Sequence, residues 1–318
     1  MQTTKIKLKN KKTQGRLGKS PLNWIICTYL IVHSLIFLFM IFWGVSTSVK
    51  TIDDFMGYIS SNGYVEPNKI WLPRGKFSEW GWTNYVNVFK NFYVTVTSKE
   101  FGQKQIWMEG MILNSLLYAG VTAIIQTFSH CWVAYLCQRF KYKFSGFLFN
   151  MIIIVNIIPI IGTNASMLQV FKKLNIYDTF FSFYLMKFTF TSMPFFVFYA
   201  SFKVIPKDFE EAAYLDGASD FKVFFTILLP MVSGTFFIFI ITGFMGYWND
   251  YMTPLIFLPT HPTFAYGVYT LVNTTINSFN RTPMRMATCV VLVVPIIILF
   301  LIFREKMMTS VRIGGMKE

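Results

Sequence analysis

Six apolar stretches, most of them free of charge, constrain the fold of this chain more than any other feature. A helix of about 20 apolar residues crosses the hydrocarbon core of a bilayer, which is about 30 Å thick. Pro159 and Gly162 predict a kink or an end of the helix in the third stretch. We therefore expect an all-α integral membrane protein with six transmembrane helices. The predicted spans cover about residues 24–45, 110–137, 147–165, 180–204, 230–250 and 286–303.

Composition agrees with lipid as the solvent for most of the chain. Hydrophobic residues make up 54% of it and charged residues only 14%, whereas a soluble domain has about 25% charged residues. The first stretch is too long for a signal peptide and lacks a small-residue cleavage site, so we expect a retained span. The four cysteines have no partners at metal-binding spacing, and we expect neither a metal site nor a cofactor.

The distribution of basic residues predicts the orientation of the spans. The tail at residues 1–22 carries seven bases and no acid, and the short loop near Arg139 and the carboxyl-terminal tail are also basic. Because cytoplasmic loops carry an excess of Lys and Arg, both termini are predicted to be cytoplasmic, with a transmembrane domain over residues 23–318. The segment 46–109 would then lie outside. We attribute the net charge of +14 to contact with anionic membrane lipid and expect no nucleic acid.

The most informative stretch is the loop between the fourth and fifth spans, at residues 205–229. Pro206 and the acidic residues after it are typical of the amino terminus of a helix. Gly217 suits the left-handed turn that ends such a helix, and Ser219 can cap the next one. The loop therefore predicts two short helices that meet at Gly217.

Seven residues of this loop stand at the spacing of a known motif. They are Glu211, Ala212, Ala213, Gly217, Ile227, Leu229 and Pro230. The pattern E-A-A-x3-G-x9-I-x-L-P resembles the EAA motif of permease subunits in ATP-binding-cassette (ABC) importers. Seven fixed positions would match by chance in a chain of this length only about a few times in a million. The resemblance implies the type I ABC importer permease fold.

Other segments narrow the resemblance to sugar-importer permeases of the maltose type. These segments are Leu215 to Ser219, Trp80 to Phe89, Gly246 to Asp250 and Arg312 to Lys317. Six spans with both ends inside make the chain similar to the shorter of the two maltose permease subunits. The resemblance implies a multi-pass protein of the bacterial cytoplasmic membrane that moves a sugar or an oligosaccharide.

The resemblance also implies how transport is coupled to ATP. In such importers the EAA loop forms a helix that sits in a groove on an ATPase subunit and transmits its closure to the membrane helices. Glu210 and Glu211 would then pair with basic groups on the ATPase. An amphipathic helix resting on the membrane surface is the alternative. The implied coupling residues are Glu210, Glu211, Ala212, Ala213, Asp216, Gly217, Ile227, Leu229 and Pro230.

The implied partners are a second permease subunit, a dimer of ATPase subunits, an extracytoplasmic solute-binding protein and membrane lipid. The sequence has no glycine-rich ATP-binding loop and no catalytic motif, so we expect no enzyme activity in this chain. An ABC permease for an amino acid, phosphate or a metal is the alternative function. A membrane transferase fits less well, because the three histidines of this chain are scattered along the sequence.

A sugar path needs hydroxyl, amide and aromatic groups inside the apolar bundle, because sugars offer hydroxyls and ring faces. For the candidates in the fifth span, residues 247–250, the alternative interpretation is an aromatic belt at a helix end. For Asn114, the alternative is a hydrogen bond between two helices. Lys187 either faces the cavity or extends to the interface, and we favour the interface. The candidate pathway residues are Asn114, Tyr247, Trp248, Asn249 and Asp250.

Overall fold

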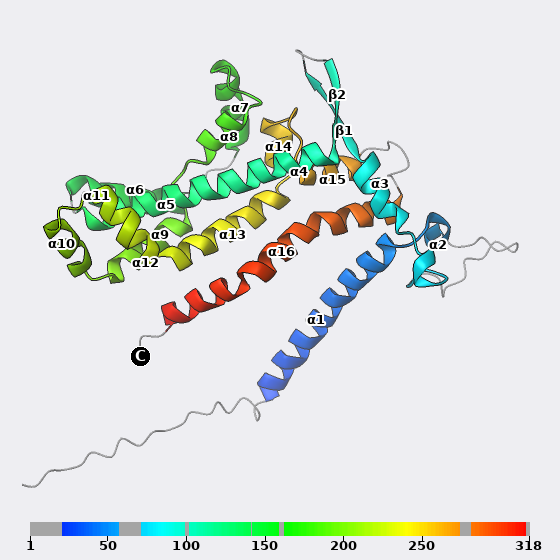
Figure 1. The fold of residues 1–318 in the computed structure, drawn as a ribbon, viewed down its shortest axis with the longest axis horizontal. Coiled ribbons are helices and arrows are strands. Elements are labelled where there is room, and N and C mark those ends of the chain that lie inside the picture. The colour runs from blue at the N-terminus through cyan, green and yellow to red at the C-terminus, as the bar shows by residue number, and fades with distance from the viewer. Residues whose placement is uncertain are drawn as a thin grey trace, which may run out of the picture.

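The structure, a computed structural model, is mostly helical (Figure 1). The basic residues of the tail that predict the orientation lie outside the described part of the chain, as does Pro159. Side chains are described up to residue 304. The described ranges are 21–56, 71–98, 102–140, 142–158, 162–273 and 281–315.

Three helices of the described part are long and apolar enough to cross a bilayer. The first is α1 (Pro21–Ser48), and the last is α16 (Thr282–Gly315). The second joins α4 (Met108–Leu116) to α5 (Thr122–Arg139) through one π-helical turn, η3 (Leu117–Val121). These helices coincide with the first, second and sixth apolar stretches.

The third and fourth apolar stretches each form two helices instead of one. The third gives α6 (Lys143–Ile157) and α7 (Thr163–Lys173), and Gly162 between them adopts a left-handed φ of 82°. The predicted interruption near Gly162 is therefore confirmed. The fourth gives α8 (Phe180–Lys187) and α9 (Met193–Val204), and the proline in the first turn of α9 suits a helix start.

The fifth apolar stretch starts with a bend. Helix α11 (Asp220–Val223) continues through η4 (Phe224–Leu228) into α12 (Leu229–Met231). The chain then turns by 77° before α13 (Ser233–Asn249). The bend falls at Val232, between α12 and α13, so the longer helix of this stretch starts at Ser233.

The expectation of an all-helical chain is wrong in one segment. Strands β1 (Tyr93–Ser98) and β2 (Gly102–Trp107) form an antiparallel hairpin with Tyr93 opposite Trp107. Residues 94–97 of β1 are all β-branched and alternate between buried Val and more exposed Thr, and this pattern favours a strand. The remaining short helices are α2 (Ile52–Met56), η2 (Phe77–Glu79), α3 (Thr83–Asn91), α10 (Asp208–Leu215), α14 (Met252–Phe257) and α15 (Phe264–Asn273).

Two hydrophobic clusters hold the bundle together. One, next to the hairpin, contains Tyr118, Phe183 and Trp248, and the other, next to α10–α12, contains Tyr135 and Phe224. Helix α5 runs between the two clusters and packs against both α9 and α13. Together with α13, which runs beside it, α5 connects the two ends of the molecule (Figure 1).

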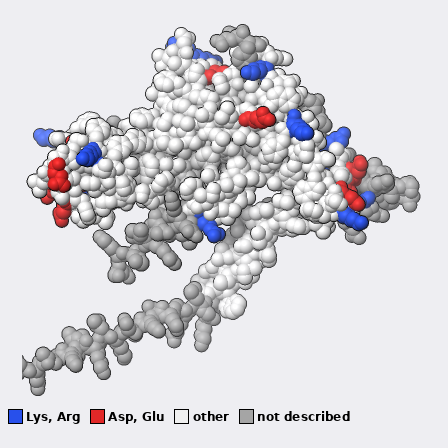
Figure 2. Space-filling view, in the orientation of Figure 1, with Lys and Arg blue, Asp and Glu red and all other residues white. Residues whose placement is uncertain are grey.

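The surface has the charge pattern of a membrane protein. Acidic and basic residues gather over the α10–α11 end and over the opposite end, and the surface between them is largely uncharged (Figure 2). Helix α1 packs along α16, and its apolar side chains are otherwise exposed. Since each exposed apolar side chain costs about 1.5–3 kcal/mol in water, this helix requires lipid or another subunit around it.

Candidate functional site

The loop between α9 and α12 folds as the sequence predicts. Helix α10 (Asp208–Leu215) has three acids in its first turn, where their negative charges interact favourably with the positive end of the helix dipole. Its end is closed by hydrogen bonds from Gly217 N to Tyr214 O (3.0 Å) and from Ala218 N to Ala213 O (2.9 Å). Gly217 has a φ of 77°, and the Ser219 hydroxyl accepts from the backbone N of Lys222. The two predicted helices and their glycine junction are confirmed.

The second helix of the loop is anchored by aromatic packing. Phe224 is fully buried, with its ring edge against Trp132 of α5 at a centroid distance of 4.7 Å. Val223 and Leu228 are also buried in this cluster. Ile227 and Leu229 of the motif are half-buried here, while Pro230 is exposed. Three apolar residues outside the motif, Val223, Phe224 and Leu228, therefore fix the loop to the cluster around α5.

A buried ion pair ties α10 to the same helix. The Nε atom of Arg139, the last residue of α5, lies 2.7 Å from Oε1 of Glu210, and both side chains are less than 10% exposed. Arg139 also donates from Nη2 to the Ile205 carbonyl at 3.0 Å. Burial raises the pKa of Glu210 above its ordinary value, and the nearby charges of Arg139 and Lys207 oppose this shift.

This pair corrects the role implied for Glu210. The carboxylate is enclosed within the chain and meets Arg139, so it is not presented to a basic group on another subunit. Glu211, Ala212 and Asp216 are exposed instead. Of the two glutamates, Glu211 is therefore the one that remains open to a partner.

The outer side of α10 is apolar as well as acidic. Leu215 is 90% exposed and Phe209 is 49% exposed. Exposure of an aliphatic side chain at a helix end, outside the uncharged surface of the protein, is unfavourable unless a partner covers it. Leu215 was not among the predicted coupling residues, although it stands two positions before Gly217, where α10 ends.

A polar cluster lies at the other end of α5, where α4, α8 and α13 meet. Tyr118, in the π-helical turn, donates from its hydroxyl to Oδ2 of Asp250 at 2.7 Å, while Oδ1 accepts from the backbone N of Thr253 at 3.1 Å. Tyr247 donates from its hydroxyl to Oε1 of Gln126 at 2.6 Å. Single π turns in helices occur often at functional sites. Sequence analysis found Tyr247 and Asp250 but missed Tyr118 and Gln126.

Lys187 belongs to this polar cluster, and the favoured interpretation that it extends to the interface is wrong. Its ammonium lies 5.5 Å from the centroid of the Tyr247 ring and 5.7 Å from that of Phe183. Within the described part of the chain, no carboxylate lies within ion-pair distance of it. A lysine among the helices of a membrane protein is costly and typical of a functional position.

The other three candidate pathway residues make contacts of a structural kind. Asn114 donates to the Pro262 carbonyl at 3.1 Å, which is the helix-to-loop role of a single asparagine. Trp248 is 1% exposed and donates from Nε1 to the Leu292 carbonyl of α16 at 2.9 Å. Asn249 is exposed and bonds to Met245 of its own helix. The structure does not bring these three side chains into the polar cluster.

Comparison with known proteins shows the family. Residues 131–312 match the family model described as binding-protein-dependent transport system inner membrane component. The chain belongs to this family. It is therefore a multi-pass permease of the bacterial cytoplasmic membrane and not an enzyme, and ATP hydrolysis lies with a separate subunit of the importer. Family membership also implies a solute-binding protein as a partner. Among the described residues, no group of three or more His, Cys, Asp or Glu could hold a metal.

Individual relatives include permeases named for carbohydrates. The chain is 25% identical to the arabinooligosaccharides transport system permease protein AraQ of Bacillus subtilis, over 64% of this chain and 72% of that protein. It is 23% identical to the sulfoquinovosyl glycerol transport system permease protein SmoH of Agrobacterium fabrum, over 93% of this chain and 94% of that protein.

A solved structure shares the fold. The structure of a bacterial ABC transporter involved in the import of the acidic polysaccharide alginate matches with a TM-score of 0.67 at 18% identity. The match covers 89% of this chain and 95% of that chain. The chain therefore has the type I ABC permease fold that the resemblance implied.

Proposed function

We propose that this chain is one of two permease subunits of an importer for a sugar or an oligosaccharide. The names of AraQ and SmoH support the carbohydrate class, since both proteins are similar to this chain over most of its length. The observation that carries the coupling role is the α10 loop, which is fixed to α5 on one side and exposes Glu211 and Leu215 on the other. This outer side would dock in a groove of the ATPase.

Transmission from the ATPase to the solute follows from the packing of α5. Closure of the ATPase dimer would shift α10, and the Arg139–Glu210 ion pair passes this shift to the end of α5. Helices α4 and α5 form one rod of 32 residues, and the π turn between them holds Tyr118 against Asp250. A rigid rod transmits displacement along its length, and the π turn at Tyr118 is the place where it can change register.

Reconstitution tests the proposed function. The chain would be assembled with its partner permease, the ATPase and the solute-binding protein in proteoliposomes, and ATP-driven uptake would be measured for a panel of labelled solutes. We expect uptake of a mono- or oligosaccharide. Uptake of an amino acid, phosphate or a metal ion, with no sugar transported, would support the alternative class of ABC permease.

We further propose six spans with both termini in the cytoplasm, which places α10 inside and α7 outside. In a variant without the native cysteines, Ser219→Cys lies in the coupling loop and Lys173→Cys lies at the exposed end of α7. An impermeant maleimide should label Lys173→Cys in intact cells and Ser219→Cys only after permeabilisation. The reverse labelling pattern would contradict this orientation.

The polar cluster is the part of the solute path that this subunit contributes. We expect Lys187→Met to reduce uptake of the transported sugar roughly tenfold or more, because a hydrogen bond to a charged group contributes about 1.5–3 kcal/mol. Lys173→Met removes an exposed lysine elsewhere and serves as the matched control. Unchanged uptake in Lys187→Met, with the complex assembled normally, would remove Lys187 from the path.

A further inference from the structure

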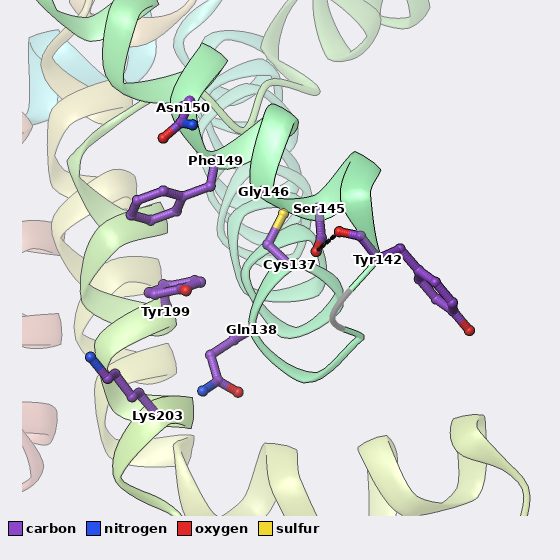
Figure 3. A pocket seen from close by; sticks show the side chains of 9 residues that line it. All are labelled: Cys137, Gln138, Tyr142, Ser145, Gly146, Phe149, Asn150, Tyr199 and Lys203. Atoms are coloured by element: carbon purple, nitrogen blue, oxygen red, sulfur yellow. Dashed lines mark hydrogen bonds between the residues drawn. The ribbon is translucent and has the colours of Figure 1, made fainter.

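A half-open cavity of about 430 Å³ lies between three helices, apart from the polar cluster. It is lined by the end of α5, the first half of α6 and the second half of α9. Figure 3 shows Gln138 projecting from α5, Tyr199 and Lys203 from α9, and Ser145 and Phe149 from α6. All three helix ends lie on the side of the molecule that carries the α10 loop.

The lining of this cavity suits a phosphate group. It combines one cation, Lys203, with the hydroxyl of Tyr199 and two amides, and it contains no carboxylate. The Ser145 hydroxyl donates to the Tyr142 carbonyl at 2.8 Å. The Lys203 ammonium has no carboxylate within ion-pair distance among the residues that the structure describes. The amide oxygen of Gln138 is buried and accepts no hydrogen bond from those residues, so it requires a donor.

The surroundings of the cavity are those of a lipid. Phe144 and Phe147 of α6 are 68% and 58% exposed, and Val204 beside Lys203 is 64% exposed. These side chains do not line the cavity and form an exposed apolar surface of α6 and α9 beside it. A polar cavity next to such a surface suits the level where headgroups meet acyl chains. A soluble anion would gain nothing from these exposed apolar side chains, whereas the acyl chains of a phospholipid would cover them.

We propose that this cavity binds the headgroup of an anionic phospholipid whose headgroup also carries hydroxyls. The phosphate pairs with Lys203, a headgroup hydroxyl donates to Gln138, and the acyl chains lie along α6. Basic pockets between membrane helices on the cytoplasmic side bind anionic headgroups in this manner. The inference rests on the proposed function in one respect, the leaflet that holds the lipid, since the proposed orientation places the three helix ends at the cytoplasmic face.

Native mass spectrometry of the assembled importer tests the site. The complex would be purified from bilayers that contain phosphatidylglycerol and phosphatidylcholine in equal amounts, and the retained lipids would be counted. We expect preferential retention of phosphatidylglycerol, reduced roughly tenfold in Lys203→Gln, which corresponds to about 1.4 kcal/mol. Lys222→Gln, an exposed lysine of α11 at the same end of the molecule, is the matched control.

A second variant fills the cavity without removing charge. Gly146 lines the cavity, and a Cβ atom placed on it meets no atom within 4 Å. Gly146→Leu should therefore fold normally and lose the retained phosphatidylglycerol, with the lysine intact. Glycerol 3-phosphate, added to the importer in phosphatidylcholine alone, distinguishes the source of the phosphate. If it binds as tightly as the lipid, the site is one for soluble phosphates and the proposal is overturned.

Two further outcomes separate this proposal from the proposed function. Equal retention of phosphatidylcholine and phosphatidylglycerol, or retention unchanged in both variants, would overturn the lipid site while sugar uptake stands. Reversed cysteine labelling would overturn the orientation, and the headgroup would then lie in the outer leaflet with its dependence on Lys203 intact.

Discussion

Arg139→Met is expected to uncouple α10 from α5 and to lower sugar uptake by at least an order of magnitude. The substitution leaves the buried carboxylate of Glu210 without its counter-charge, and removing one partner of a buried pair costs about 3–5 kcal/mol. The Ile205 carbonyl also loses its donor. Hydrogen exchange of the α10 amides in the assembled importer is the direct measurement, and it should become much faster.

Two controls show whether the effect lies in the pair itself. The double variant Arg139→Met with Glu210→Met removes both charges, and it should restore much of the protection of α10, because no buried charge is left unpaired. Lys222→Met removes an exposed lysine of the same loop and should leave exchange unchanged. Slow exchange in the single variant Arg139→Met would contradict the role of the ion pair in positioning α10.

Leu215→Asp is expected to abolish co-purification of the ATPase without disturbing the fold. The side chain is 90% exposed, so the substitution removes no contact within the chain. In a docked complex it would remove about 1.5–3 kcal/mol of apolar burial and introduce a charge that the interface must desolvate. Since about 1.4 kcal/mol is tenfold in affinity, we expect binding to weaken by a factor of at least ten.

The matched control is Leu174→Asp, at the end of α7. That leucine is 59% exposed and lies far from the α10 loop (Figure 1). It should leave co-purification of the ATPase unchanged. Normal ATPase binding and normal uptake in Leu215→Asp would mean that the exposed side of α10 is not the docking surface, and the helix would then be an amphipathic segment on the membrane.

Local sequence signals predicted the coupling loop well. Acids at the start of a helix, a glycine at its end and a serine cap act over a few residues, and each appears in the structure at the predicted position. The interruption at Gly162 followed from the same kind of signal. Such preferences depend only on neighbouring residues, so they can be predicted from the sequence without a structure.

Long-range contacts were outside the reach of the sequence. Arg139 and Glu210 meet although 71 positions separate them. The resemblance had implied that both Glu210 and Glu211 face the ATPase. The inward orientation of Lys187 depends on how α8 packs against α13. The hairpin at residues 93–107 was not predicted, because the long segment between the first two apolar stretches gives little information to a search for apolar spans.

The sequence by itself determined the solvent, the family motif and the local form of the coupling loop, because hydropathy and capping act at short range. Tertiary structure alone decided which of the two glutamates stays exposed, which polar side chains meet Asp250, and that three helices line a cavity with one lysine. These features depend on which helices become neighbours, and packing decides that between segments far apart in the chain.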